Sequence, residues 1–540
     1  MPDNYNSIPR DEQQAESQPL LASPPSAKTK FRRIITAAIL VAVGSGIVAG
    51  VIVLFTQQPT VPKRNVIMMI SDGFGPASET YARQYHMWRE NLAPKDSLLP
   101  LDYAHVGHSR TSSSSSLVTD SAAGATAFAC ALKSYNGAIG VHPDKTPCGT
   151  VLESAKIHQG MITGLVVTSR ITHATPASFS AHIDWRDREP EIAEQQIGYS
   201  PLGRTVDLMF GGGACEFLSN ETEGSCRADA RDLFSEARDQ FGWDVKLSRE
   251  EFDAIKPSAK LPLMGIFAPS HMSYEIDRNP SQQPALHEMT EKALAILESA
   301  TSGQDHGFFL VIEGSRIDMA AHTNDPAAHV HDIHEYHRTA KTVFDFVDKH
   351  PNTIVISTSD HETGGLTVGR QVGKEYPEYK WNPEVISRVR NSSEALAGVW
   401  KNAHEGQEEK AAADFMKKVI IEDGLGIEDP SKEEIRRLMN VDLTNGTEQL
   451  EYDLSEMVSR RALIGWTTHG HTAVDVNLYA YGQGSDRLAG SHENTDIGDF
   501  ISEYLGLNLA DITSRLNEVS FFKAESISEP RVSIHEKSHD

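Results

Sequence analysis

Basic residues are scarce in this chain of 540 residues. Lysine and arginine number 50 against 75 aspartates and glutamates, which gives a formal net charge of −25. A broad nucleic-acid surface requires clustered positive charge, so this balance excludes that class of protein. Any anion-binding site would instead depend on a few local cations or on metal ions. The length and the apolar share of 39% predict a globular protein with a large buried core.

Apolar runs of membrane-spanning length are equally scarce. One run, residues 34–55, contains 22 residues without a charge, enough for a helix to cross a hydrocarbon core of about 30 Å. It is too long, and begins too late in the chain, for an ordinary cleaved signal peptide. Four basic residues within 28–33 precede it, so the positive-inside rule predicts a disordered cytosolic tail at 1–33. We expect residues 34–55 to be a signal-anchor helix and 56–64 a linker.

The predicted topology gives the two flanks different environments. Three glycosylation sequons lie after the span, where a lumen or the cell exterior would allow modification: Asn220, Asn391 and Asn445. Before the span, "ESQPLL" places an acid ahead of Leu20 and Leu21. This pattern resembles the dileucine signals that cytosolic adaptors read to deliver membrane proteins to lysosomes or vacuoles. We therefore expect a sorting adaptor to bind the tail.

Cysteine is also rare, and all four cysteines follow the span. This position fits an oxidising compartment. Cys215 and Cys226 bracket the short loop "CEFLSNETEGSC" and are predicted to form a disulfide. For Cys130 and Cys148 two readings stay open: they pair, or Cys130 is an inert buried thiol in an alanine-rich helix.

Short continuous apolar runs recur after the span and end in polar residues. "NVIMMI", "GLVVTS", "FFLVIEG" and "NTIVIST" each lead into acids, histidines or hydroxyls. Such runs predict parallel strands covered on both faces by helices, and ligands collect beyond the carboxyl ends of these strands. We expect an α/β fold, a three-layer sandwich with a large, mostly parallel central sheet.

The polar residues at these strand ends form a set without a thiolate. A single acid after a strand is usually a turn residue or a helix cap. Four strand ends that each carry acids, histidines or hydroxyls are harder to explain in that way. Oxygen and imidazole ligands suit zinc together with a harder cation such as magnesium. The set is Asp72, Glu313, Asp318, His322, Asp360 and His361, with the later His471.

The segment "TSSSSSLVTDSAAGATAFACAL" places one serine apart from its neighbours. Ser121 follows an acid and opens a row of small residues, whereas residues 112–116 form an unbroken serine run. A serine at a helix N-terminus, beside a metal ion, can be held as an alkoxide. Two interpretations stay open for the residues alone: Ser121 is a nucleophile preceded by a polar approach loop at 112–116, or the whole segment is a polar loop that runs into an alanine-rich helix.

Six motifs in order resemble the alkaline phosphatases over about residues 63–505: "ISDGFG", "VTDSAAGATA", "HATPASFSAHIDWR", "VIEGSRIDMAAH", "STSDHETGG" and "HTAVDVNLYAYG". The resemblance implies a homodimer, two zinc ions and one magnesium ion per active site, and hydrolysis of phosphate monoesters, phosphoproteins included, through a phosphoserine. With its tail and single anchor, the chain is most similar to the fungal vacuolar members. This implies a catalytic domain, residues 65–505, in the vacuole lumen.

The resemblance also assigns roles by position. Ser121 would be the nucleophile, and Arg186, eleven residues after Thr175, would grip the phosphate. The implied ligands of the first zinc are Asp318, His322 and His471; those of the second are Asp72, Asp360 and His361; those of magnesium are Asp72, Thr175 and Glu313. His469 lies near the last motif and is left as a neighbour.

Several segments depart from the family pattern or lie outside it. His173 stands where some relatives carry a carboxylate, and Met319 stands where others carry lysine or histidine. Charged, helical sequence at about 366–465 is predicted to be an insertion. Residues 506–540 are predicted to be a short helix and a mobile tail, a candidate propeptide. The cluster "HVHDIHEYH" at 329–337 is interpreted as partly exposed structural histidines on an amphipathic helix.

Two other functions compete with phosphate monoester hydrolysis. A phosphodiesterase or sulfatase of the same superfamily would usually present threonine or a modified cysteine as nucleophile, and would lack Thr175 and Glu313 as a third metal set. A membrane-tethered protein with structural zinc would close each ion with four protein ligands, whereas three are assigned here beside a nucleophile.

Overall fold

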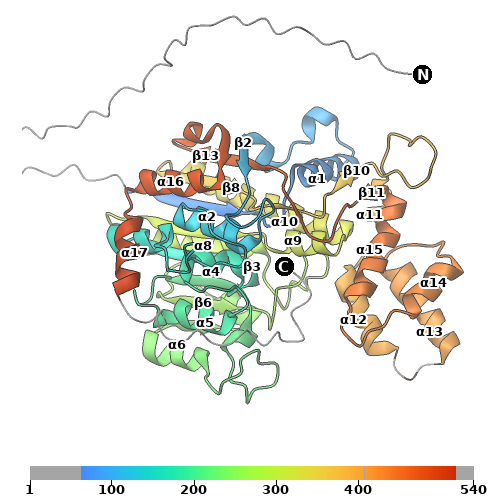
Figure 1. Ribbon diagram of the computed structural model, residues 1–540, viewed down its shortest axis with the longest axis horizontal. Helices are drawn as coiled ribbons and strands as arrows, with labels where there is room; N and C mark the ends of the chain where they lie inside the picture. The colour runs from blue at the N-terminus through green and yellow to red at the C-terminus, as the bar shows by residue number, and fades with distance from the viewer. Residues whose placement is uncertain (1–62, 405, 407, 519–540) are drawn as a thin grey trace, which may run out of the picture. The chain divides into compact units, whose positions relative to one another are not determined.

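A computed structural model describes residues 63–404, 406 and 408–518 of the chain (Figure 1). Ten strands form one sheet in the spatial order β14-β2-β13-β8-β1-β7-β3-β4-β6-β5. Their bounds are β1 Asn65–Ile70, β2 His105–Arg110, β3 Ile162–Arg170, β4 Leu208–Gly212, β5 Asp244–Lys246, β6 Leu263–Ile266, β7 Phe308–Glu313, β8 Thr353–Thr358, β13 Val476–Gly482 and β14 Gly490–Glu493. Four two-residue strands form two small ladders: β9 Glu362–Thr363 with β12 His471–Thr472, and β10 Thr367–Val368 with β11 Ile464–Gly465.

Most neighbouring strands of the large sheet run parallel. Strand β1 lies between β7 and β8, and its last residue, Ile70, pairs with both Glu313 and Thr358. The three carboxyl ends therefore lie level at one edge of the sheet. Strand β13 is antiparallel to both of its neighbours, β2 and β8. The predicted α/β fold with a large, mostly parallel sheet is confirmed, with β13 as the antiparallel member.

Helices cover both faces of this sheet, and a further group of helices, within residues 383–462, lies beside it (Figure 1). They are α1 Pro76–Arg89, α2 Ser121–Cys130, α3 Val151–Gln159, α4 Ala174–Ser180, α5 Glu189–Glu194, α6 Leu233–Phe241, α7 Arg249–Ala254, α8 Leu286–Ala300, α9 Arg316–His322, α10 Pro326–Lys349, α11 Pro383–Ile386, α12 Ser393–Ala403, α13 Glu409–Phe415, α14 Lys432–Met439, α15 Glu448–Ala462, α16 Asn494–Leu505 and α17 Leu509–Glu518. Short non-α turns are η1 Pro94–Asp96, η2 Pro100–Ala104, η3 Gln195–Tyr199, η4 Ala214–Phe217, η5 Met416–Gly424 and η6 Ser485–Leu488.

The core is divided by the sheet into two apolar clusters. Ile67 and Met69 of β1 pack in one cluster with residues of α8 and α10, while Val66 and Met68 pack in the other with residues of α2, α3 and α16. Successive side chains of a strand point to opposite faces, so one central strand contributes to both layers. This explains why its sequence, "NVIMMI", is apolar throughout instead of alternating.

Helices α11–α15 lie between β10 and β11, within the range predicted for the insertion (Figure 1). The two short strands pair antiparallel, Thr367 with Gly465 and Val368 with Ile464, and join the insertion's entry and exit. Helix α15 buries Leu450, Leu454 and Met457 on one face. The helices are held by apolar packing of amphipathic faces, as their charged sequence predicts.

Several predicted features fall outside the described residues. They are the cytosolic tail, the anchor at 34–55, most of the linker and the end of the tail from 519 onward. In the segments that the structure does describe, no helix combines the length and the apolar character needed to span a bilayer.

Both cysteine pairs form disulfides. Cys215–Cys226 closes the predicted short loop. Cys130–Cys148 is also formed, which decides between the two readings left open by the sequence. This second bond ties the last residue of α2 to the segment before α3.

The histidines of α10 divide into two pairs. His331 and His334 are partly exposed, as predicted, whereas His329 and His337 are buried, 0% and 2% exposed, which corrects the expectation for this second pair. His329 Nδ1 donates to the Ile317 carbonyl at 2.9 Å, and its Nε2 accepts from Ser78 Oγ at 2.8 Å. Burial lowers the pKa of His329 to about 4. The structural role holds, but internal hydrogen bonds replace the expected solvent contact.

Candidate metal centre and nucleophile

The carboxyl ends of adjacent strands deliver the predicted side chains to one place. Asp72 lies two residues after β1, Glu313 ends β7, and Asp360 and His361 follow β8. All four side chains are completely buried. Burial of several acids together is unfavourable unless a cation or hydrogen bonds compensate for the charge.

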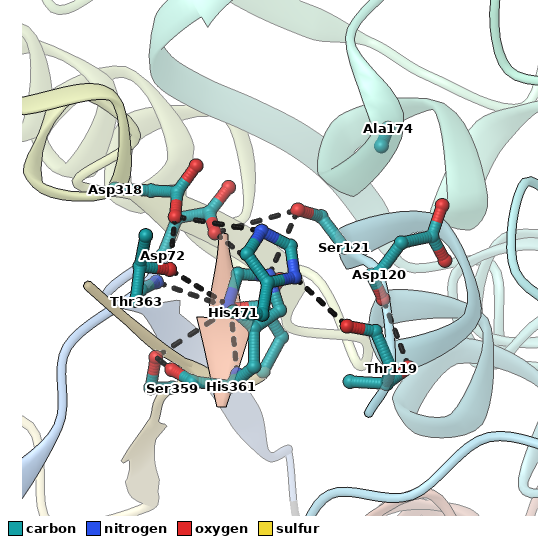
Figure 2. A network of polar contacts seen from close by, with 12 residues as sticks. Asp72, Thr119, Asp120, Ser121, Ala174, Asp318, Ser359, His361, Thr363 and His471 are labelled. Atoms are coloured by element: carbon teal, nitrogen blue, oxygen red, sulfur yellow. Dashed lines mark hydrogen bonds and ion pairs between the residues drawn. The ribbon is translucent and has the colours of Figure 1, made fainter. Parts of the chain in front are cut away.

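Ser121 is the first residue of α2 and faces this group (Figure 2). Its Oγ lies 3.0 Å from His361 Nε2 and 3.5 Å from Asp72 Oδ1. The preceding Asp120 caps the helix, because its carboxylate accepts the Ala123 N–H at 2.9 Å. A helix N-terminus carries partial positive charge, so this position favours a negatively charged oxygen.

Close packing of α2 against the β8 end depends on a glycine. A Cβ placed on Gly124 would approach Asp360 Cβ to 2.9 Å. The small residues after Ser121 therefore serve the approach of the helix to the ligands, which gives a physical reason for the row "SAAGA". The serine run before it is different: Ser113 and Ser115 bond to each other and to nearby backbone groups, away from Ser121.

Asp318, His322 and His471 converge as the first predicted group. His322 Nε2 lies 3.1 Å from Asp318 Oδ2 and 3.2 Å from His471 Nε2. The Nδ1 atoms of the two rings donate to the carbonyls of His469 and Thr119, at 2.5 and 2.8 Å. In neutral rings both Nε2 atoms are then acceptors that point at one another beside a carboxylate. Three converging acceptors without a shared proton fit a bound cation.

Asp72, Asp360 and His361 converge as the second group. His361 Nε2 lies 3.4 Å from Asp72 Oδ1 and 3.3 Å from Asp360 Oδ2. The Oδ2 atoms of both aspartates are buried without a hydrogen-bond partner. Burial, followed by the charge of Asp360, raises the pKa of Asp72 well above its ordinary value. Burial alone would lower the pKa of His361, but Asp360 raises it.

A third group surrounds Asp72 on its other side. Asp72, His173 and Glu313 bring one ligand atom each within 4.8 Å of one another. Glu313 Oε1 and Thr175 Oγ1 are buried and lack a hydrogen-bond partner, although Ser169 Oγ donates to the other Glu313 oxygen at 3.2 Å. Burial raises the pKa of Glu313 to about 7. The oxygen-rich donor set fits a hard cation.

Arg186 is the predicted phosphate-binding residue and is 7% exposed. Its Nη1 donates to Asp120 Oδ2 at 3.2 Å, and its Nη2 donates to His173 Nε2 at 3.1 Å. Burial and the nearby guanidinium lower the pKa of His173 well below its ordinary value, so this ring is neutral. The Asp120 side chain thereby links the fork of Arg186 to the start of the nucleophile helix.

The structure adds positioning residues that the sequence analysis did not assign. Thr363 Oγ1 donates a short hydrogen bond to Asp318 Oδ1. His469, left as a neighbour, makes a reciprocal pair with His322: its Nδ1 donates to the His322 carbonyl at 2.7 Å while its own carbonyl accepts from His322. Thr363 lies inside the motif "SDHETGG", which was the available signal. Met319 packs in a small buried cluster with Tyr274.

The chain is similar to known proteins over most of its length. A family model described as alkaline phosphatase matches residues 63–507. An alkaline phosphatase of Schizosaccharomyces pombe is 50% identical over 455 residues, which cover 84% of this chain and 83% of the relative. The repressible alkaline phosphatase of Saccharomyces cerevisiae is 45% identical over 479 residues, which cover 84% of each chain.

Solved structures with the same fold include metal-containing relatives. A cold-active alkaline phosphatase from a psychrophilic Shewanella species is similar with a TM-score of 0.68 and 30% identity, over 82% of this chain and 99% of that chain. A TAB5 alkaline phosphatase mutant, with one histidine replaced by aspartate, holds magnesium in a site named M3. It is similar with a TM-score of 0.56 and 26% identity, over 83% of this chain and 99% of that chain.

Proposed function

The chain belongs to the alkaline phosphatase family, a family of metal-dependent phosphatases, and we propose that it hydrolyses phosphate monoesters through a phosphoserine on Ser121. One observation carries the proposal. Ser121 Oγ lies at the N-terminus of α2, 3.0 Å from His361 Nε2, where the converging acceptors fit bound cations. A hydroxyl buried there has no structural need for so many acidic neighbours, because a hydrogen bond to one of them would satisfy it.

The proposed reaction has two balanced steps. Ser121 Oγ gives its proton to solvent and forms a bond to phosphorus, while the bond from phosphorus to the alcohol oxygen breaks and that oxygen takes a proton from solvent. Water then attacks phosphorus and loses a proton, the Ser121 ester bond breaks, Ser121 Oγ regains a proton, and inorganic phosphate leaves. Arg186 offers a planar fork to two phosphate oxygens, and Asp120 fixes the direction of that fork. The Thr119 carbonyl and Thr363 hold His471 and Asp318 in place during both steps.

We assign two zinc ions and one magnesium ion to the three groups. Zinc suits the first two groups because each combines carboxylate with imidazole: Asp318 with His322 and His471, and Asp72 and Asp360 with His361. Magnesium suits the oxygens of Asp72, Thr175 and Glu313. When bound, such ions neutralise charge on the phosphoryl oxygens and lower the pKa of hydroxyl groups. The buried, partnerless oxygens of Asp72, Asp360, Glu313 and Thr175 support this assignment.

His173 is proposed as a hydrogen-bond donor beside the third group instead of a ligand. Its Nε2 accepts from Arg186, so the neutral ring carries its proton on Nδ1, the atom that faces the acids. The TAB5 mutant with aspartate in place of a histidine holds magnesium in its M3 site. By analogy, replacing His173 with aspartate would add a carboxylate oxygen and tighten magnesium binding.

We propose that the enzyme is a single-pass membrane protein of the vacuole, with residues 34–55 as the anchor and the catalytic domain in the lumen. The uncharged run, its basic flank and the "ESQPLL" signal support this location. An oxidising lumen also fits the two disulfides. A homodimer, glycosylation at the three sequons and removal of the tail beyond about 506 belong to the same proposal. They are tested by sedimentation, glycosidase treatment and mass measurement of the mature protein.

Covalent trapping tests the proposed chemistry. The enzyme is mixed with a labelled phosphate monoester, quenched in acid, digested and mapped by mass spectrometry. We expect label on the peptide that contains Ser121, since a phosphoserine is stable in acid. Ser121→Ala should remove the label and lower turnover about 10³-fold, with residual hydrolysis by direct attack of water.

Matched controls separate the nucleophile from the serine run and from other chemistries. Ser113→Ala changes a partly exposed hydroxyl of the approach loop and should keep wild-type turnover and labelling. Phosphodiester and sulfate ester substrates are assayed in parallel. Label on any other residue, undiminished turnover in Ser121→Ala, or a preference for diesters or sulfate esters would contradict the proposal.

A further inference from the structure

The first turn of α12 contacts both ends of α9. At the start of α9, Arg316 Nη2 donates to the two carboxylate oxygens of Glu394, at 2.9 and 2.8 Å. Just after its end, Asp325 Oδ2 accepts the backbone N–H of Ser393 at 2.7 Å. Ser393 and Glu394 are the first two residues of α12. One turn of the insertion therefore bridges the two ends of a seven-residue helix.

The contact at Arg316 joins a buried guanidinium to the Glu394 side chain, which is 45% exposed. Arg316 is 3% exposed, its guanidinium stacks 3.6 Å from the centroid of the Tyr274 ring, and its Nη1 lies 3.0 Å from Met319 Sδ. Tyr274 is itself 2% exposed. A guanidinium held among an aromatic ring and a thioether is costly without an anionic partner, and Glu394 supplies one. Removing that partner would leave a buried charge uncompensated.

The contact at the other end also forms part of a larger junction. Asp325 caps α10 by accepting the N–H groups of Ala327 and Ala328 at 2.9 and 3.0 Å, while its second oxygen reaches α12. Asp277 accepts the Ser392 N–H at 3.0 Å. Two carboxylates thus meet the N-terminus of α12, where the helix dipole favours negative charge. The junction is fixed by charge-assisted bonds as well as by packing.

Helix α9 carries two of the three residues of the first group, Asp318 and His322. The third, His471, belongs to β12 and donates to the Thr119 carbonyl, while His469, two residues earlier, is paired with His322. A displacement of α9 relative to that carbonyl would change the 3.2 Å separation between the Nε2 atoms of His322 and His471. Ligands of a metal ion tolerate only small shifts before affinity falls.

We propose that the first turn of α12 is a positioning element of the first metal group, with Glu394 and Arg316 as its positioning residues. Through them the insertion sets the place of α9, and so the zinc affinity of Asp318, His322 and His471. The inference rests on the zinc assignment made under the proposed function. This positioning role makes the helical insertion part of the framework that supports the active site.

Zinc release from the purified full-length holoenzyme tests the proposal. Zinc content is first counted by elemental analysis, and transfer to a chromogenic chelator is then followed in time. Glu394→Gln keeps the size of the side chain and removes its charge. We expect one zinc ion per chain to leave about tenfold faster, with kcat lowered and KM for a monoester nearly unchanged. Glu394→Asp, which retains the charge, should restore most of the slow release.

The insertion offers a matched control in a second ion pair. Arg370, just after β10, donates from Nη1 and Nη2 to Glu456 of α15, at 2.7 and 2.8 Å. This pair lies within the insertion, near its entry, and its hydrogen bonds do not reach α9. Glu456→Gln should lower the melting temperature while zinc release and kcat keep their wild-type values.

Each remaining outcome is decisive. Zinc release from Glu394→Gln at the wild-type rate would overturn the positioning role. Equally fast zinc release from Glu456→Gln would also overturn it, because the effect would then reflect a general loss of stability. If Glu394→Gln does not fold, Arg316→Lys replaces it: the charge stays, the planar group is lost, and faster zinc release is again expected. Absence of zinc from the wild-type holoenzyme would instead refute the zinc assignment, which separates that failure from this one.

Discussion

Asp72 and Glu313 at the strand ends face other carboxylates, whereas Glu434 of the helical insertion faces a guanidinium group. At the strand ends, burial and three neighbouring acids raise the pKa of Asp72. In the insertion, Arg461 donates to both oxygens of Glu434, at 2.8 and 3.1 Å, and lowers the pKa of that glutamate to about 2. The paired charges stabilise the fold by themselves. The unpaired carboxylates at the strand ends oppose folding, and destabilising charges of this kind are typical of binding and catalytic sites.

Metal removal is the strongest way to test this contrast. A chelator should lower monoester hydrolysis about 10³-fold or more, about 4 kcal/mol of transition-state stabilisation, and zinc with magnesium should restore it. The melting temperature should fall as well, because Asp72, Asp318 and Asp360 then repel one another. Activity, metal content and unfolding are measured on the same samples. Full activity in protein shown to be free of metal would refute the metal-based reading of the strand ends.

Arg186 is a buried guanidinium beside the nucleophile candidate, and we expect its replacement to have the next largest effect. Arg186→Lys keeps the charge but loses the planar fork, so kcat/KM should fall about 10- to 100-fold. Folding should be nearly unaffected, since Asp120 still caps α2 through Ala123. Steady-state kinetics and thermal unfolding measure the two quantities. A variant with wild-type kcat/KM would show that the fork does not hold phosphate.

The pH dependence of the metal-free protein probes the unpaired acids directly. Burial raises the folded-state pKa of Glu313 from 4.5 to about 7, so the folded chain binds this proton more tightly than the unfolded chain does. Stability from Glu313 is therefore full below about pH 4.5 and is lost as the pH rises toward 7. Between pH 5 and 8 the free energy of unfolding should fall by about 1 to 3 kcal/mol more than in Glu313→Gln.

Denaturant titrations of both metal-free proteins supply this difference. Loaded with metal, the two proteins should lose their pH-dependent difference or reverse it, because the ionised carboxylate is then the favoured form. Parallel pH curves for the two metal-free proteins would show that Glu313 is not under electrostatic stress.

Breaking an ion pair of the insertion should have the smallest effect of these changes. Glu434→Gln breaks the pair with Arg461, and we expect the free energy of unfolding to fall by about 1 kcal/mol or less. The folded pKa is lowered to about 2, so this stability is present above the ordinary value of 4.5 and disappears as the pH falls toward 2. Unfolding at pH 7 and at pH 3 should show the effect shrinking, with kcat/KM unchanged at neutral pH. A loss of activity in Glu434→Gln would contradict the view that this pair stabilises the fold without taking part in catalysis.

The strand-end set could be read from the sequence because the signal is local. Asp72 comes just after the apolar run "VIMMI", and Asp360 with His361 comes just after "TIVIST". The ends of these buried strands could therefore be predicted from the sequence. Parallel strands bring such ends to one edge whatever the length of the chain between them. The fold class and the clustering of these residues were therefore within reach.

Contacts made through backbone atoms and through burial could not be read in the same way. The Thr119 carbonyl that orients His471 is a property of the folded path, and no residue type encodes it. The burial of His329 depends on Ser78 and Ile317, which arrive from other elements. The pairing of Cys130 with Cys148 required the end of α2 to meet a distant loop.

Strand β13 has a consequence for the order in which the protein is made. In the sheet, β2 lies between β13 and β14, both of which follow residue 475, and β2 leads into the loop that carries Ser121. Synthesis runs from the N-terminus, so a nascent chain holds the serine long before it holds either strand neighbour of β2 or the imidazole of His471. The proposed nucleophile is thus translated early, and the site around it is completed late. A chain that stalls before β12 would carry the serine motif in full and remain catalytically silent.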